Sequence, residues 1–229
     1  MLLDALASIT PDESRCVLLR GEGKDFCAGA DFSDVASSAA SGARYGAGFE
    51  RLLHAIEDHP LPLVVEVKGA ALGAGCQLLA AADLAVAATD ARIGIPSAKI
   101  GILLDLEKIQ RMVRVLGPAR AREMLLTGRA ISGTEAVAWG LATKAVATED
   151  IEAATRALAE EVADNAPLSV RGSKAGIRAV LRHGALDRET DAGAFAPHDE
   201  ATLRAVSSSD VAEGLAARKD KRRPQFRGE

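Results

Sequence analysis

The chain has 229 residues, 48% of them hydrophobic and 26% charged, a globular balance that excludes wholesale disorder and corresponds to one large or two small domains. The formal net charge is −4 and aromatic residues make up only 3% of the chain, which argues against nucleic-acid binding. The three cysteines have no metal-ligand spacing, so buried, reduced thiols are expected. The amino terminus shows no export signal, and we predict a cytoplasmic protein.

Short apolar strands alternate with helical segments over the first two thirds of the chain. The long apolar stretch 69–88 is crowded with glycine at its start and interrupted by Gln77 and Asp83, which favours a buried element of a globular protein over a membrane span. The predicted strands are 16–20, 63–67, 84–88, 91–95 and 141–146, and the predicted helices are 1–8, 42–58, 76–82, one ending near Gly117, one opening at Pro118, and one running from a capping box at Ser132 to Trp139.

The pattern becomes almost entirely helical between residues 150 and 217. Its breaks fall at Pro167, at Gly184 and around 207–209. Strand–turn–helix units therefore come first and helices last. This order predicts an α/β fold, with an α/β core over residues 1–149 and a helical C-terminal part over residues 150–229.

Several common catalytic signatures are missing from the sequence. The run Gly73–Gly75 lacks the third glycine of a dinucleotide-binding loop, and no serine lies in a G-x-S-x-G motif. Neither a Rossmann site nor a serine hydrolase is therefore favoured. The four histidines form no pair with metal-ligand spacing, and no metal site is predicted.

Two turns of small residues, Lys24–Phe32 and Gly69–Gln77, carry more information. Each follows a buried strand, and small side chains leave the backbone N–H groups open to a ligand. Two such turns can together form an oxyanion hole with two donors; alternatively, they are only tight turns that need glycine. The residues alone leave both interpretations open.

Together the two turns resemble the two fingerprints of the crotonase (enoyl-CoA hydratase/isomerase) superfamily. The resemblance continues in order along nearly the whole chain, through segments 93–101, 115–120, 124–128, 136–141 and 210–214. It implies a crotonase-like spiral of ββα units, here residues 1–149, and trimerisation helices, here residues 150–229. It also implies binding of acyl-CoA thioesters by a homotrimer or hexamer, with no cofactor besides the coenzyme A of the substrate. No nucleic-acid or membrane partner is expected.

The resemblance also assigns roles to particular residues. The backbone N–H groups of Ala30 and Ala74 fall at the two oxyanion-hole positions, where they would hold the thioester carbonyl oxygen. That role needs N–H groups rather than side chains, so alanine is compatible with it. The stretch that includes Ala28, Asp31 and Phe32 resembles the segment that lines coenzyme A.

Two positions depart from the hydratases of this family, which carry a glutamate at each; here they are Gln77 and Ser97. Adding water to an enoyl double bond needs a base for the water and an acid for the α-carbon, and each contributes about 10²–10⁴-fold. Neither glutamine nor serine supplies these groups, so ordinary hydratase activity is not expected. Asp105 falls where some members use a catalytic aspartate, but aspartate there is also favoured as the N-cap of the next helix.

Two functions from different classes follow. One is an enzyme, an acyl-CoA isomerase or lyase that stabilises a thioester enolate with Ala30 and Ala74 and moves protons with Asp105. The other is a non-catalytic acyl-CoA carrier or regulator that keeps the binding groove without the acids. The orientation of the Asp105 carboxyl distinguishes the two functions: a carboxyl that points into the groove favours the enzyme, and one that points back onto its helix favours the carrier.

Overall fold

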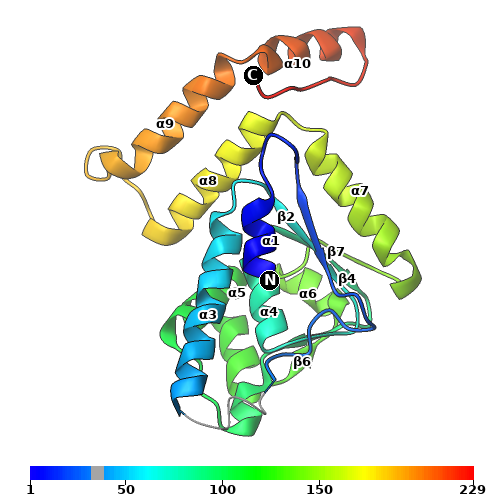
Figure 1. Ribbon diagram of the computed structural model, residues 1–229, viewed down its shortest axis with the longest axis vertical. Coiled ribbons are helices and arrows are strands. Elements are labelled where there is room, and N and C mark those ends of the chain that lie inside the picture. The colour runs from blue at the N-terminus through cyan, green and yellow to red at the C-terminus, as the bar shows by residue number, and fades with distance from the viewer. Residues whose placement is uncertain (32–38) are drawn as a thin grey trace.

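The structure, a computed structural model, describes residues 1–31 and 39–229 (Figure 1). Its main sheet has four parallel strands in the order β1-β2-β4-β7. Apart from Glu66 in β2, strands β2 and β4 are runs of apolar residues rather than alternating patterns, as expected for a parallel sheet that is covered on both faces. The strands are β1 (Val17–Arg20), β2 (Leu63–Val67), β4 (Leu84–Ala88) and β7 (Lys144–Val146).

A second, smaller sheet contains β3 (Ala70–Leu72), β5 (Arg92–Gly94) and β6 (Ala130–Ile131). β2 runs into β3 and then a helix, and β4 runs into β5 and then a 3₁₀ turn and a helix. This order confirms the predicted ββα units. Sequence reasoning missed β3 and β6, because strands of two or three residues are too short to show a period.

Capping and glycine signals mark several features of the core helices, although α3 and α4 begin a few residues before their predicted starts and the two helices predicted around Gly117 form one kinked helix. Gly117, with a φ of 72°, kinks α5 before Pro118. At α6 the Ser132 hydroxyl accepts from the Glu135 N–H at 3.1 Å, and the Glu135 carboxylate accepts from the Ser132 N–H at 2.8 Å. The elements are α1 (Leu2–Ser8), α3 (Ala39–Asp58), α4 (Ala74–Ala81), α5 (Leu106–Thr127) and α6 (Gly133–Trp139), with 3₁₀ turns η1 (Pro96–Ile100) and η2 (Thr148–Asp150).

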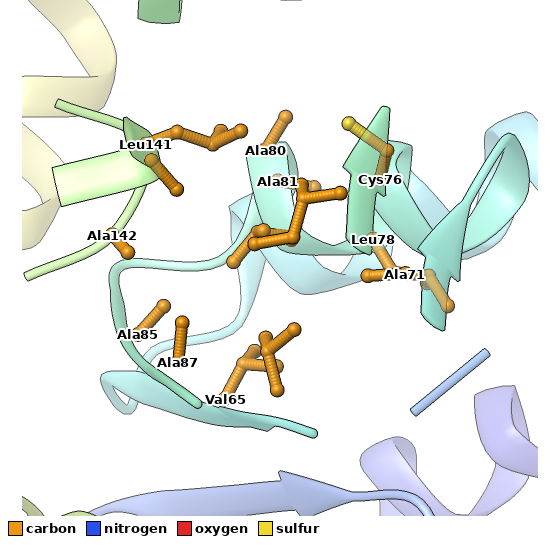
Figure 2. Packing of buried hydrophobic residues seen from close by; sticks show 14 of the residues in the cluster. Val65, Ala71, Cys76, Leu78, Ala80, Ala81, Ala85, Ala87, Leu141 and Ala142 are labelled. Carbon is orange, nitrogen blue, oxygen red and sulfur yellow. The ribbon is translucent and has the colours of Figure 1, made fainter. Parts of the chain in front are cut away.

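Small side chains of α4 and of the main sheet belong to one hydrophobic cluster (Figure 2). The cluster includes Cys76, Leu78, Ala80 and Ala81 of α4, Val65, Ala85 and Ala87 of the sheet, and Leu141 and Ala142 before β7. Burial raises the pKa of the Cys76 thiol to about 12. All three cysteines are free, as predicted, but only Cys76 is fully buried, because Cys16 precedes its strand and Cys27 lies in a turn.

The C-terminal part is helical, and the predicted breaks at Pro167, Gly184 and 207–209 are confirmed. It contains α7 (Ile151–Ala163), α8 (Pro167–His183), α9 (Ala192–Val206) and α10 (Ser209–Asp220). α7 packs on β2 and β4, whereas α9 and α10 extend away from the body of the molecule (Figure 1). None of the helices within residues 1–31 and 39–229 has the length and apolar character needed to cross a bilayer.

A lysine of α8 forms a buried polar contact with the core. The Lys174 ammonium donates to the Asp83 carboxylate at 2.7 Å, to the Leu61 carbonyl at 3.0 Å and to the Ile56 carbonyl at 3.3 Å. Its side chain is only 9% exposed, so the three acceptors replace the water that the charge has lost. α8 is therefore held against the segments that precede β2 and β4.

Candidate functional site

The two small-residue turns lie against one another. The Cys27 N–H donates to the Ala70 carbonyl, and the Leu72 N–H donates to the Cys27 carbonyl, both at 2.9 Å. Cys27 and Ala71 thus form an isolated parallel bridge. The first turn is therefore hydrogen-bonded along β3, which is part of the second turn.

Glycine is required where these turns meet. A Cβ on Gly75 would lie 2.3 Å from the Cys27 carbonyl oxygen, so a larger residue would force the turns apart. Gly73 has a φ of 54°, and a Cβ built on it would lie 4.0 Å from the Cα of Gly29. Ala30 and Ala74 each directly follow one of these two facing glycines, so the fold brings both predicted residues to adjoining positions.

The N–H groups of Ala30 and Ala74 are available as donors. Ala74 is the first residue of α4, and an N–H at that position has no acceptor within its helix. Neither N–H has a hydrogen-bond acceptor in the part of the chain that the structure describes. The positive end of the helix dipole lies at the same place, so it strengthens the attraction of the Ala74 N–H for a negatively charged oxygen. Two such donors can bind an oxygen that carries negative charge.

Gln77 and Ser97 follow neighbouring strands of the second sheet. β3 and β5 pair in parallel, and the Gly73 N–H donates to the Gly94 carbonyl at 2.8 Å, so α4 and η1 start from the same edge. Gln77 is 1% exposed, and its two amide atoms have no partner among the described residues. Ser97 is half-buried in η1. No carboxylate stands at either position.

Asp105 caps its own helix. Its carboxylate accepts from the Lys108 N–H at 3.0 Å and forms an ion pair with the Lys108 ammonium, while 52% of its side chain is exposed. Partial burial opposes ionisation, but the hydrogen bonds from Lys108 outweigh it and lower the pKa of Asp105. The predicted N-cap is confirmed, and the carboxyl points back onto α5.

The residues expected along coenzyme A are placed in part. Ala28 and Asp31 are exposed in the first turn, on either side of Gly29 and Ala30. Phe32 lies outside the described residues. Exposure next to the unpaired Ala30 N–H is compatible with contact to a ligand that extends out of the site.

A buried charged cluster between α3 and α5 escaped sequence reasoning. Glu50 accepts from Arg111 at 2.7 Å and lies 3.5 Å from the Lys108 ammonium. Glu50, His54 and Glu107 also place ligand atoms within 4.8 Å of one another. Because two cations already neutralise Glu50, the cluster is better explained as an ion-pair network than as a metal site. In sequence these residues are typical of solvated helix faces, and only the packing of two helices joins them.

A cavity of about 910 Å³ lies elsewhere, between the end of α4 and helix α8. Its apolar lining includes Leu79, Val170, Ile177 and Phe226. None of the described residues predicted for the site lines it. The cavity is therefore separate from the facing turns.

Solved structures of known proteins share this architecture. The enoyl-CoA hydratase/carnithine racemase of Magnetospirillum magneticum superposes with a TM-score of 0.89 at 30% identity, covering 100% of this chain and 84% of that one. The repeated ββα units and the C-terminal helices are therefore those of a crotonase-fold protein.

Sequence comparison extends the match to a family. The enoyl-CoA hydratase/isomerase family profile matches residues 1–229. The human enoyl-CoA hydratase domain-containing protein 2, mitochondrial, is 37% identical over 99% of this chain and 78% of its own length. The carnitinyl-CoA dehydratase of Proteus mirabilis is 32% identical over 93% of this chain and 82% of its own. The chain belongs to the enoyl-CoA hydratase/isomerase family.

Proposed function

We propose that this protein binds acyl-CoA thioesters and stabilises their enolate form with two backbone N–H groups. The observation that carries this proposal is the contact between the two glycine turns, which brings the unpaired N–H groups of Ala30 and Ala74 to adjoining positions. The thioester carbonyl oxygen binds between these donors, and the remainder of coenzyme A passes the exposed Ala28 and Asp31.

The chemistry of such a site is electrostatic. Enolate formation moves negative charge onto the carbonyl oxygen, and preorganised N–H donors stabilise that charge; losing one such donor typically costs about 10²–10³-fold in turnover. Both donors are backbone groups, so they survive any side chain that the turns accept. A protein that only binds acyl-CoA keeps them as well, because they also hold the neutral carbonyl.

Proton transfer is the step for which the site is poorly equipped. Gln77 and Ser97 do not ionise near neutral pH and so do not act as a general acid or base, and Asp105 pairs with Lys108 at the start of α5. A carboxylate whose pKa is lowered is a weaker base. This orientation favours the second candidate function, a non-catalytic acyl-CoA carrier or regulator, over an isomerase or lyase that uses Asp105.

Acyl-CoA binding without hydration is the expected result for the purified protein. Isothermal titration calorimetry with saturated and unsaturated acyl-CoAs should show binding, because the two N–H donors are intact. Hydration of crotonyl-CoA should remain at least about 10²-fold below that of a two-glutamate relative assayed alongside, because both proton-transfer groups are missing. Rapid hydration by the pure protein would contradict the assignment of Gln77 and Ser97, and absence of binding to every acyl-CoA would contradict the proposed function itself.

Self-association as a homotrimer or hexamer is expected as well. Helices α8, α9 and α10 expose large apolar side chains, and such surfaces in a folded chain commonly mark interfaces. These side chains are Ile177, Val180, Leu181, Leu203, Val206, Val211 and Leu215. Light scattering at micromolar concentration should give a multiple of 23.8 kDa, and a monomer under these conditions would overturn the prediction.

A further inference from the structure

The cavity between α8 and the end of α4 has a lining that the proposed function does not use. It measures about 910 Å³, within the size range of pockets that take small molecules. The α8 residues that line it recur at intervals of one and three positions from Ser169 to Arg182, so they share one face of the helix. At a rise of about 1.5 Å per residue, this wall is about 20 Å long. The cavity therefore suits an elongated ligand.

The end of the cavity near the start of α8 is apolar. Its lining there includes Val170 and Phe226, which belongs to the C-terminal tail. The tail lies beside Pro167, since a Cβ built on Gly228 would be 2.8 Å from the Pro167 ring. The Gly228 N–H also donates to the buried Asp210 carboxylate at 2.9 Å, which holds the tail in place. This end therefore offers a fixed wall against which hydrocarbon can pack.

The opposite end of the cavity is cationic. The Arg114 guanidinium donates to the Leu181 carbonyl at 3.3 Å and forms no ion pair with any of the described residues. Arg178 and Arg182 share the carboxylate of Asp58, which is not part of the lining. Three guanidinium groups at this end are therefore balanced by one carboxylate.

The other charged groups of the lining are paired with opposite charges. The Arg111 guanidinium donates to the Glu57 carboxylate at 2.7 Å, and the Lys174 ammonium donates to the Asp83 carboxylate, also at 2.7 Å. The uncompensated charge of the cavity therefore lies at the Arg114 end, and it is positive. Guanidinium groups pair well with carboxylates, because two parallel N–H donors match the two oxygens.

We propose that this cavity binds a fatty-acid anion, with its carboxylate beside Arg114 and Arg182 and its hydrocarbon chain along α8 toward Phe226. Such a ligand is charged at one end and apolar over the rest of its length, as the lining is. The inference goes beyond the proposed function, because the cavity is separate from the facing turns and the ligand carries no coenzyme A.

Charge complementarity favours this ligand over other occupants. A neutral chain leaves the positive excess without a partner, and a small hydrophilic anion leaves the apolar end in contact with water. A second copy of this chain is the remaining alternative, because Ile177 and Leu181 of the lining are 62% and 49% exposed. The experiment therefore includes the second copy as one of its outcomes.

The experiment is isothermal titration calorimetry with decanoate and decanol, which have the same chain length and differ in the head group. The unaltered protein should bind decanoate about 10-fold more tightly, because hydrogen bonds to the charged carboxylate add to the burial of the chain. Saturating decanoate should leave the affinity for butyryl-CoA unchanged, because the two ligands occupy separate sites.

Arg114→Gln tests the cationic end. It removes the charge and keeps a side-chain donor, so decanoate should bind about 10-fold more weakly while decanol binds as before. Arg120→Gln is the matched control, because Arg120 is exposed on the same helix and does not line the cavity. The control should bind both ligands like the unaltered protein.

Ile177→Asp tests the wall beside the cationic end. Its carboxylate would repel the ligand carboxylate, so decanoate affinity should fall at least about 10-fold. Val180→Asp is the control, because Val180 is 53% exposed on the same helix and lies outside the lining. Both variants should fold, since both positions are exposed, and both should keep the affinity for butyryl-CoA.

Absence of decanoate binding, or equal affinity for decanoate and decanol, would overturn the inference. So would decanoate binding that neither Arg114→Gln nor Ile177→Asp weakens. Competition between decanoate and butyryl-CoA would also overturn it, because decanoate would then lie at the facing turns. If Ile177→Asp dissociates an oligomer in light scattering and leaves decanoate binding unchanged, the cavity belongs to a second copy. Failure to bind any acyl-CoA would remove the proposed function and leave this inference standing.

Discussion

Hydration of crotonyl-CoA should rise by about 10²-fold or more when Gln77 and Ser97 are both replaced by glutamate. The two positions follow β3 and β5 at one edge of the second sheet, beyond the turns that we propose bind the thioester carbonyl. Glutamates there would supply the base for water and the acid for the α-carbon. Since Gln77 is buried, burial should also raise the pKa of a glutamate at that position toward neutrality, where it acts well as an acid. The measurement is the steady-state loss of crotonyl-CoA absorbance.

The control is a second double variant, Gln77→Glu with Ala98→Glu. Ala98 is the exposed neighbour of Ser97 in η1, so this variant adds the same number of charges with one of them outside the site. Only the Ser97 combination should gain activity. If it folds and binds acyl-CoA but hydrates no faster than the unaltered protein, the acyl group does not lie between these positions and our placement of the site is wrong.

Replacing Asp105 should show whether its carboxyl group acts as a helix cap or as a proton-transfer group. At neutral pH Asp105→Ala should lower the free energy of unfolding by about 1 kcal/mol, while Asp105→Asn, which keeps a cap acceptor, should change it by roughly a few tenths. Acyl-CoA affinity should be nearly unchanged in both variants. If Asp105 is catalytic, Asp105→Asn should also reduce any measurable turnover by about 10²-fold. Unchanged turnover would exclude the catalytic role and leave the carrier as the better function.

The pH dependence of this effect has a defined sign. Folding lowers the pKa of Asp105, so the folded state favours the carboxylate and gains stability from it above the usual value of 3.8. This contribution is lost as the pH falls through the lowered pKa. Denaturant unfolding should therefore show the gap between the unaltered protein and Asp105→Ala at neutral pH and its closure in strong acid. If the difference in free energy of unfolding persists after the Asp105 carboxylate is protonated, the stabilisation does not come from the attraction between that carboxylate and Lys108.

Local signals in the sequence were sufficient for most elements of the fold. Val64 and Val65 lie in a mostly apolar run that predicts a buried parallel strand, and β2 has the predicted bounds. The capping box at Ser132 and the break at Gly117 are also local, since each depends on residues a few positions apart. Such features are readable because hydrogen bonds and backbone angles within a turn do not need distant partners.

The sequence by itself also determined which chemistry stands at each position: small residues in two turns, Gln77 and Ser97 in place of glutamates, and an aspartate before α5. Only the tertiary structure decided how these groups meet. Gly29 and Gly73 face each other because Cys27 pairs beside β3, a contact between segments more than forty residues apart. The orientation of Asp105 depends on the side-chain position of Lys108, and the orphaned amide of Gln77 depends on everything that packs around it. Contacts of this kind arise from packing between distant segments, and no local pattern records them.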